Sequence, residues 1–86
     1  MRKIEWKHSA VKDLRGIASG SVASILEAIR DLADDPKPHG CRKLHGSEHT
    51  YRIRIGDYRV IYSIENSALT IWIVRIGHRK EVYRRP

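Results

Sequence analysis

The alternation of apolar and polar residues on both sides of Gly56-Asp57 is the feature that most constrains the fold of this chain. Period-2 alternation around a two-residue turn that contains glycine is a strong signal of a β-hairpin. In this register Ile55 lies opposite Tyr58, and Arg54 lies opposite Arg59. One face of the predicted hairpin is therefore apolar and consists of Tyr51, Ile53, Ile55, Tyr58, Val60, Tyr62 and Ile64.

The opposite face of the hairpin, which we call the arginine face, carries Arg52, Arg54 and Arg59. Cross-strand neighbours have Cβ atoms roughly 4.5–5.5 Å apart, a distance at which like charges repel each other. Folding alone gives no reason to place these cations together, whereas the binding of an anion does. The alternative is a solvated sheet face without a binding role, and the distribution of charge along the chain argues against it.

The net charge of the 86-residue chain is +7, and nearly all of the excess lies in its second half. Residues 1–40 contain seven Lys/Arg and six Asp/Glu, whereas residues 41–86 contain ten and four. A strongly basic region favours a polyanionic partner. The predicted hairpin lies in this basic half, so we expect the anion to bind there.

A third strand is predicted from Ala68 to Ile76, after a turn at Asn66-Ser67. Strict alternation divides it between the two faces: Leu69, Ile71 and Ile73 on the apolar face, and Trp72, Val74 and Ile76 on the arginine face. The apolar face of the three strands then requires a second layer to cover it.

Apolar residues at helical spacing before the hairpin supply that layer. They predict one helix capped by Ser9 and a second capped by Ser21, which ends at Asp34-Asp35-Pro36. Residues 3–7 predict a short opening strand, and residues 36–48 a linker. The expected fold is a single α+β domain over residues 1–86, with two N-terminal helices packed on one face of a small antiparallel sheet.

The single cysteine, Cys41, excludes an internal disulfide and fits a reducing compartment. No secretory signal is recognisable at residues 1–6, and the apolar runs are too short to span a membrane. We therefore expect a soluble protein of the cytoplasm that has no membrane partner.

A histidine-rich segment is the only pattern that suggests a metal, and its members are His39, Cys41, His45 and His49. This spacing is compatible with zinc ligands. Arg42 and Lys43 would place positive charge beside the ion, however, so we favour a loop without a metal. No other cofactor is expected.

Three motifs carry a resemblance to a known family: KLHG at 43–46, YRIRIGDYRVIY at 51–62 and IGHRKEVY at 76–83. Together with the order of the elements, they closely resemble the RelE/ParE superfamily, the small basic toxins of bacterial and archaeal toxin–antitoxin pairs. The resemblance covers almost the whole chain. It implies an antitoxin protein as partner, which covers or distorts the basic face.

The superfamily divides by activity, because RelE-like members cut messenger RNA in the ribosomal decoding site and ParE-like members inhibit DNA gyrase by protein binding. RelE-like enzymes carry two outward basic residues on the first hairpin strand, an arginine after the turn, an arginine after the third strand and a tyrosine near the C-terminus. By position, these are Arg52, Arg54, Arg59, Arg79 and Tyr83. The resemblance therefore implies a ribosome-dependent endoribonuclease that also contacts 16S-type ribosomal RNA. The alternatives are a gyrase-directed toxin and a non-catalytic RNA-binding module.

The expected reaction is attack of the RNA 2′-OH on the adjacent phosphate. Arg54 and Arg59 are the expected phosphate clamp, because guanidinium groups bind phosphate in a bidentate manner. Arg79 is expected to stabilise the leaving oxygen. Tyr83 either stacks on an unpaired base and relays a proton, or covers the sheet edge.

His78 is the candidate general base, because its unperturbed pKa lies near neutrality. Strict alternation from Val74 places His78 on the arginine face, although Gly77 permits a bulge that reverses this. A base from the first hairpin strand is excluded, since Arg52 and Arg54 stand where RelE-like enzymes often have lysine, and arginine does not lose its proton. The further RNA-binding candidates are Arg52, Lys43, Trp72 and Lys80.

Overall fold

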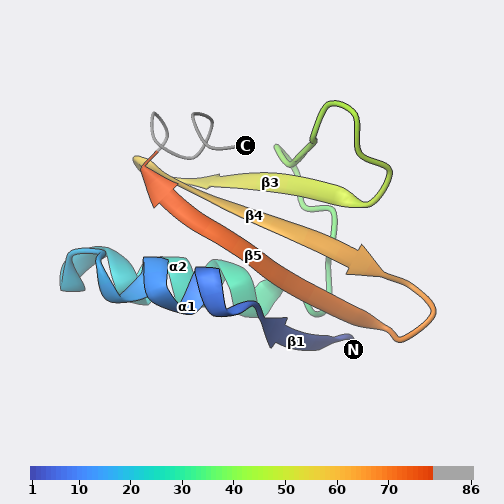
Figure 1. Ribbon diagram of the computed structural model, residues 1–86, viewed down its shortest axis with the longest axis horizontal. Helices are drawn as coiled ribbons and strands as arrows, with labels where there is room; N and C mark the ends of the chain where they lie inside the picture. The colour runs from blue at the N-terminus through green and yellow to red at the C-terminus, as the bar shows by residue number, and fades with distance from the viewer. Residues whose placement is uncertain (79–86) are drawn as a thin grey trace.

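The computed structural model describes residues 1–78 (Figure 1). Within this range the chain forms one five-stranded sheet in the order β1-β5-β4-β3-β2. Two helices lie on the same side of it, as the blue and teal ribbons of Figure 1 show. The elements are β1 (Lys3–Trp6), α1 (His8–Arg15), α2 (Ser19–Asp31), β2 (Arg42–Lys43), β3 (Thr50–Ile55), β4 (Tyr58–Glu65) and β5 (Thr70–His78). The predicted α+β architecture is confirmed.

The hairpin of β3 and β4 has the predicted register, with Ile55 opposite Tyr58 and Arg54 opposite Arg59. Gly56 adopts a φ of 60° at the first central position of the turn. Positive φ at this position alone is typical of a type II′ turn, which matches the twist of the two strands. The turn therefore fixes which residues of β3 and β4 share a face.

The core lies between the helices and the predicted apolar face of the sheet, which we call the helix face. Its buried side chains are Ala10, Ile25, Ile29, Leu32, Ile53, Val60, Tyr62, Ile64, Ile71, Ile73 and Ile76. Tyr51, Ile55 and Tyr58 are partly buried against this cluster, as the alternation predicts.

Strand β1 pairs with β5 in parallel, so the sheet is mixed rather than wholly antiparallel. The pairing of β1 with β5 ends at Ile73, and beyond this point α1 lies along the same edge of β5. The Ser9 hydroxyl donates a hydrogen bond to the Val74 carbonyl at 2.8 Å, and the Ile76 amide donates to the Asp13 carboxylate at 2.9 Å. Helix side chains thus satisfy backbone groups that would otherwise form an exposed sheet edge.

The two predicted N-caps are wrong. Helix α1 begins at His8 and α2 at Ser19, and neither has a side-chain cap. Ser9 instead bonds to β5, because its position one residue inside α1 places it beside that strand. No helix among residues 1–78 combines the length and the apolar character that crossing a membrane requires.

A bulge in β5 corrects the predicted faces of that strand. The register shifts between Ile61 and Tyr62 of β4, so that Ile61 pairs with Arg75 and Tyr62 with Ile73. Val74 is the extra residue. After it the alternation inverts, and Ile76 is buried in the core instead of lying on the arginine face.

Leu69 does not join the apolar face either. It has a φ of 48°, lies in the turn before β5 and is 59% exposed. The turn is two residues longer than predicted, so β5 begins at Thr70 rather than at Ala68.

Candidate nucleic-acid interface

The arginine face is ordered as two rows of side chains that cross neighbouring strands. The strand registers align Arg42, Arg52, Ile61 and Arg75 in one row, on β2, β3, β4 and β5. The next row contains Arg54, Arg59 and Gly77. Gly77 contributes no side chain, so the second row consists of two directly opposed arginines.

Four of these arginines surround one small pocket of about 220 Å³, which we call the arginine pocket. Its lining consists of Gly40, Arg42, Arg52, Ile53, Arg54 and Arg59. No Asp or Glu of residues 1–78 lines it. Four guanidinium groups around one small space concentrate positive charge there, and guanidinium matches the geometry of phosphate. The electrostatics of the pocket therefore favour a phosphate-sized anion.

Local backbone geometry positions the groups at this pocket. The Nε of Arg54 donates to the Gly56 carbonyl at 3.3 Å, so the turn orients the guanidinium beside the hairpin end. Gly40 adopts a φ of 90° in the segment that leads into β2. A residue with a side chain is strained in that conformation, so glycine allows the chain to bend toward β3 here.

Arg75 occupies the same row but has a different partner. Its Nε donates to the Asp13 carboxylate at 2.8 Å, and its Nη2 donates to the other carboxylate oxygen at 3.1 Å. Such bidentate geometry is the strongest form of an arginine–carboxylate pair. Arg75 therefore connects β5 to α1 and does not line the arginine pocket.

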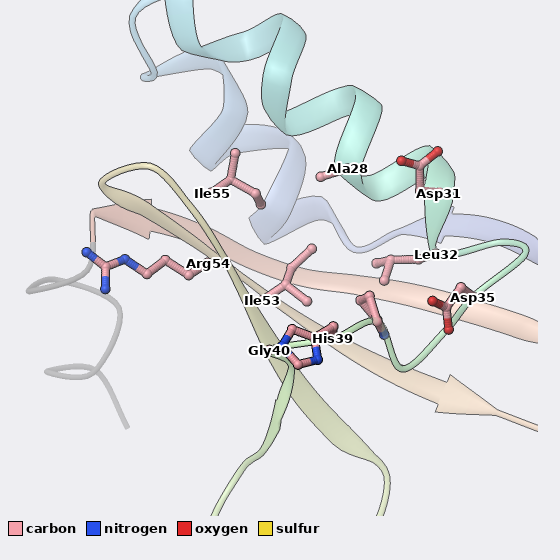
Figure 2. Close-up of a pocket in the computed structure, with 10 residues that line it drawn as sticks. Ala28, Asp31, Leu32, Asp35, His39, Gly40, Ile53, Arg54 and Ile55 are labelled. Atoms are coloured by element: carbon pink, nitrogen blue, oxygen red, sulfur yellow. The ribbon is translucent and has the colours of Figure 1, made fainter.

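A larger neighbouring pocket of about 530 Å³ lies between α2 and β3 and has a different character (Figure 2). Ala28, Leu32, Ile53 and Ile55 give it an apolar wall, and its two carboxylates are Asp31 and Asp35. In Figure 2 the Arg54 side chain extends away from Leu32 and the carboxylates. Size does not make this pocket the better candidate, because an anion would meet carboxylates there.

The register places His78 on the helix face, opposite Tyr58. Its ring contacts the Tyr58 ring edge-on, with centroids 6.0 Å apart. The bulge at Val74 causes this placement, since it inverts the alternation before Gly77 is reached. The expectation from strict alternation is therefore wrong for His78.

The other RNA-binding candidates of the described region lie apart from the arginine pocket. Trp72 pairs with Ser63 on the arginine face, as predicted, but it does not line the arginine pocket. Its Nε1 donates to Glu65 at 2.9 Å, and the Lys7 ammonium lies 4.6 Å from its ring centroid. Lys43 pairs with Tyr51, and its side chain is therefore on the helix face.

Arg79, Lys80 and Tyr83 lie outside the described residues. Their expected roles remain proposals.

Arg42 is a member of the site that sequence reasoning missed. It lies in β2, a strand of two residues inside the segment predicted to be a linker. Two residues are too few to show alternation. The sequence feature that could have indicated Arg42 is its position next to the KLHG motif. Pairing with Arg52 brings the Arg42 side chain to the pocket.

The segment that carries Gly40 toward β2 is tied to the core through Tyr62. The Tyr62 ring is fully buried, and its hydroxyl donates to the Pro36 carbonyl at 2.7 Å. Burial raises the pKa of this hydroxyl, so it remains a protonated donor at any physiological pH.

We expect Tyr62→Phe to lower the free energy of unfolding by about 1 kcal/mol, because it removes this hydrogen bond and keeps the ring. Urea denaturation measures the change. Tyr51→Phe is the matched control, since the structure gives the Tyr51 hydroxyl no hydrogen bond within residues 1–78. Equal stability of the two variants would contradict the anchoring role of Tyr62.

No three His, Cys, Asp or Glu side chains of the described chain are close enough together to hold a metal ion. The histidine-rich segment of His39, Cys41, His45 and His49 therefore forms no such cluster.

Known proteins that resemble this chain in sequence are all toxins of one superfamily. The family model described as "ParE toxin of type II toxin-antitoxin system, parDE" matches residues 4–83. The chain is 30% identical over 83 residues to toxin RelG of Mycobacterium tuberculosis, covering 95% of both chains. It is 30% identical over 86 residues to putative toxin RelE1 of Methanocaldococcus jannaschii, covering 96% of both.

Solved structures show the same fold. RelE in the archaeal RelE–RelB complex from Pyrococcus horikoshii gives a TM-score of 0.80 at 29% identity, covering 93% of this chain and 97% of that one. The isolated E. coli RelE toxin gives a TM-score of 0.81 at 20% identity, with coverage of 98% and 93%. The second likeness concerns the fold alone.

Proposed function

This chain belongs to the RelE/ParE superfamily of toxin–antitoxin toxins, and on that premise we propose that it is a ribosome-dependent endoribonuclease that cleaves messenger RNA. The observation that carries the proposal is the arginine pocket. Four guanidinium groups from three neighbouring strands surround a space that no described carboxylate lines. This arrangement is explained better by the binding of a phosphodiester than by a role in packing the core.

The chemistry requires little more than positioning and charge stabilisation. The 2′-oxygen forms a bond to phosphorus while the bond to the 5′-oxygen breaks, so that a cyclic phosphate and a 5′-hydroxyl result. Holding the reacting atoms in line contributes roughly 7–11 kcal/mol to such reactions. Arg54 and Arg59 would stabilise the charge that develops on the non-bridging oxygens, at roughly 3–4 kcal/mol per well-placed donor.

Two protons must also move, and the arginines cannot accept the first of them. We propose that Arg79 stabilises the leaving 5′-oxygen as a hydrogen-bond donor, and that Tyr83 stacks on a base and relays a proton. His78 lies beside Tyr58 on the helix face, so it would have to reach the phosphate from the face of the sheet opposite the arginine pocket.

A His78→Gln variant tests whether this histidine transfers the proton. Loss of a general base lowers the rate roughly 10²- to 10⁴-fold, whereas a side chain on the helix face should change it less than about threefold. We expect the smaller change in single-turnover cleavage on ribosomes. A rate loss above 100-fold, together with loss of the acidic limb of the pH profile, would restore His78 as the base.

Translating ribosomes mixed with the protein, followed by mapping of the 5′ ends of the message, test the proposed function. Cuts at ribosome-occupied codons are the expected result. RNA binding without cuts would support a non-catalytic module instead. Intact RNA together with inhibition of DNA supercoiling would support the gyrase-directed activity of ParE-like toxins.

A cognate antitoxin is the second expected partner. The structural relatives include RelE in complex with RelB from Pyrococcus horikoshii and from Methanococcus jannaschii. An exposed cationic face makes neutralisation by an acidic protein segment electrostatically favourable. We propose that the protein acts in the cytoplasm, where both the ribosome and the antitoxin are found.

A further inference from the structure

A second basic pocket lies on the helix face, at the end of the sheet that the helices leave uncovered. Its volume is about 550 Å³. The lining residues that matter here are Arg2, Lys37, Lys43, Glu48, His49 and Tyr51. None of them belongs to the arginine pocket, so the two sites are separate.

The charges of this second basic pocket favour an anion. Arg2, Lys37 and Lys43 supply positive charge, while Glu48 is the one carboxylate among the described lining residues. The Glu48 side chain is 89% exposed and lies 3.8 Å from the His49 Nε2. The Lys37 ammonium is 5.4 Å from the Tyr51 ring centroid, which holds it near the pocket.

Arg2 adds an observation that points to a ligand. Its Nε is buried and makes no hydrogen bond within the described residues. A buried donor without a partner is costly, and more so when it belongs to a charged group. Arg2 also lines the pocket, so an anion bound there would compensate the charge of its guanidinium group.

The geometry of β2 relates the two pockets to each other. Arg42 and Lys43 are consecutive, and their pairing with Arg52 and Tyr51 sends one side chain to each face of the sheet. Arg42 lines the arginine pocket, and Lys43 lines the second basic pocket. The β2–β3 edge therefore presents cations on both sides, and a single phosphate group cannot contact both.

We propose that the second basic pocket binds a phosphate of a second RNA backbone segment, so that the β2–β3 edge inserts between two segments of a folded RNA. The choice of RNA as the polyanion rests on the proposed function. A single message strand in the arginine pocket supplies one backbone segment, whereas folded ribosomal RNA supplies others beside it. The second basic pocket would then contribute to ribosome binding and not to the chemical step.

Charge reversal separates these two contributions. Lys37→Glu/Lys43→Glu alters only side chains that are exposed, so the fold should be retained. The matched control is Lys12→Glu/Arg15→Glu on α1, which makes the same change in net charge with residues that line neither pocket. The readouts are the Kd for ribosomes at several salt concentrations and the single-turnover cleavage rate at saturating ribosome concentration.

We expect the Kd of Lys37→Glu/Lys43→Glu to rise at least about tenfold over that of the control, and the slope of log K against log salt to decrease by about 2. The cleavage rate at saturation should stay within about twofold of wild type, because positioning in the arginine pocket is intact.

A Kd equal to that of the control would overturn the proposal. Weakened antitoxin binding with unchanged ribosome binding would also overturn it, since the anion would then be a protein. If the double variant fails to fold, Lys43→Gln should show the same change with a salt slope smaller by about 1.

A binding experiment without ribosomes keeps this inference distinct from the proposed function. Titration of the wild-type protein with a short RNA duplex, followed by NMR, should shift the amide signals of Lys43, His49 and Tyr51. These shifts are expected even if no message is ever cut. Shifts confined to Arg52, Arg54 and Arg59 would overturn the second site while leaving the proposed function untouched.

Discussion

Arg54→Ala and Arg59→Ala are each expected to lower cleavage of ribosome-bound message by about 10²- to 10³-fold, which is the usual effect of removing one preorganised donor to a developing anion. Each variant should melt at the wild-type temperature or slightly above it. The reason is that the two side chains are directly opposed across β3 and β4, so the relief of a repulsion offsets the contacts that either side chain loses. Single-turnover cleavage and thermal unfolding measure the two effects.

Arg75→Ala is the matched control for these variants. It removes an arginine from the same face, but one that is paired with Asp13 and lies outside the arginine pocket. We expect a clear loss of stability with cleavage close to wild type. A large loss of thermal stability in both Arg54→Ala and Arg59→Ala would mean that these arginines support the fold, which contradicts the site.

Asp13→Ala is expected to lower the free energy of unfolding by about 2–3 kcal/mol, because the carboxylate accepts charge-assisted hydrogen bonds that no other group replaces. It accepts two from Arg75, at 2.8 and 3.1 Å, and one from the Ile76 amide at 2.9 Å. Its side chain is 17% exposed, so water replaces these bonds incompletely. For a chain of this size the melting temperature should fall by about 10–20 °C.

The control for Asp13→Ala is Asp31→Ala, which removes an exposed carboxylate from the end of α2. A surface change of this kind should alter stability by no more than about 0.5 kcal/mol. Guanidinium denaturation of the three proteins gives the comparison. Equal stability of the two variants would show that α1 does not secure the β5 edge.

Local patterns predict the hairpin fully because its register depends on neighbouring residues alone. The Gly56-Asp57 turn and the alternation beside it specify which arginines oppose each other. The faces of β5 could not be predicted in the same way. The bulge at Val74 arises where β5 leaves β1 and meets α1, and this contact joins residues more than 60 positions apart.

The candidate site was predictable to the extent that it lies on the hairpin. Arg52, Arg54 and Arg59 line the arginine pocket as the alternation indicates. Arg42 joins them through the pairing of β2 with β3, and a strand of two residues is too short for its pattern to reveal. The face on which His78 lies was likewise not predictable from local sequence. Its face depends on a bulge four residues before it, which no local pattern reveals.

The most direct test of the arginine pocket is a structure of the protein on ribosomes that carry a message with a 2′-deoxy nucleotide at the cleavage position. Such a message lacks the nucleophile and therefore remains intact. We expect the phosphate that follows this nucleotide to lie within hydrogen-bonding distance of the guanidinium groups of both Arg54 and Arg59. A message backbone that passes the protein elsewhere, with the arginine pocket facing solvent or protein, would contradict it.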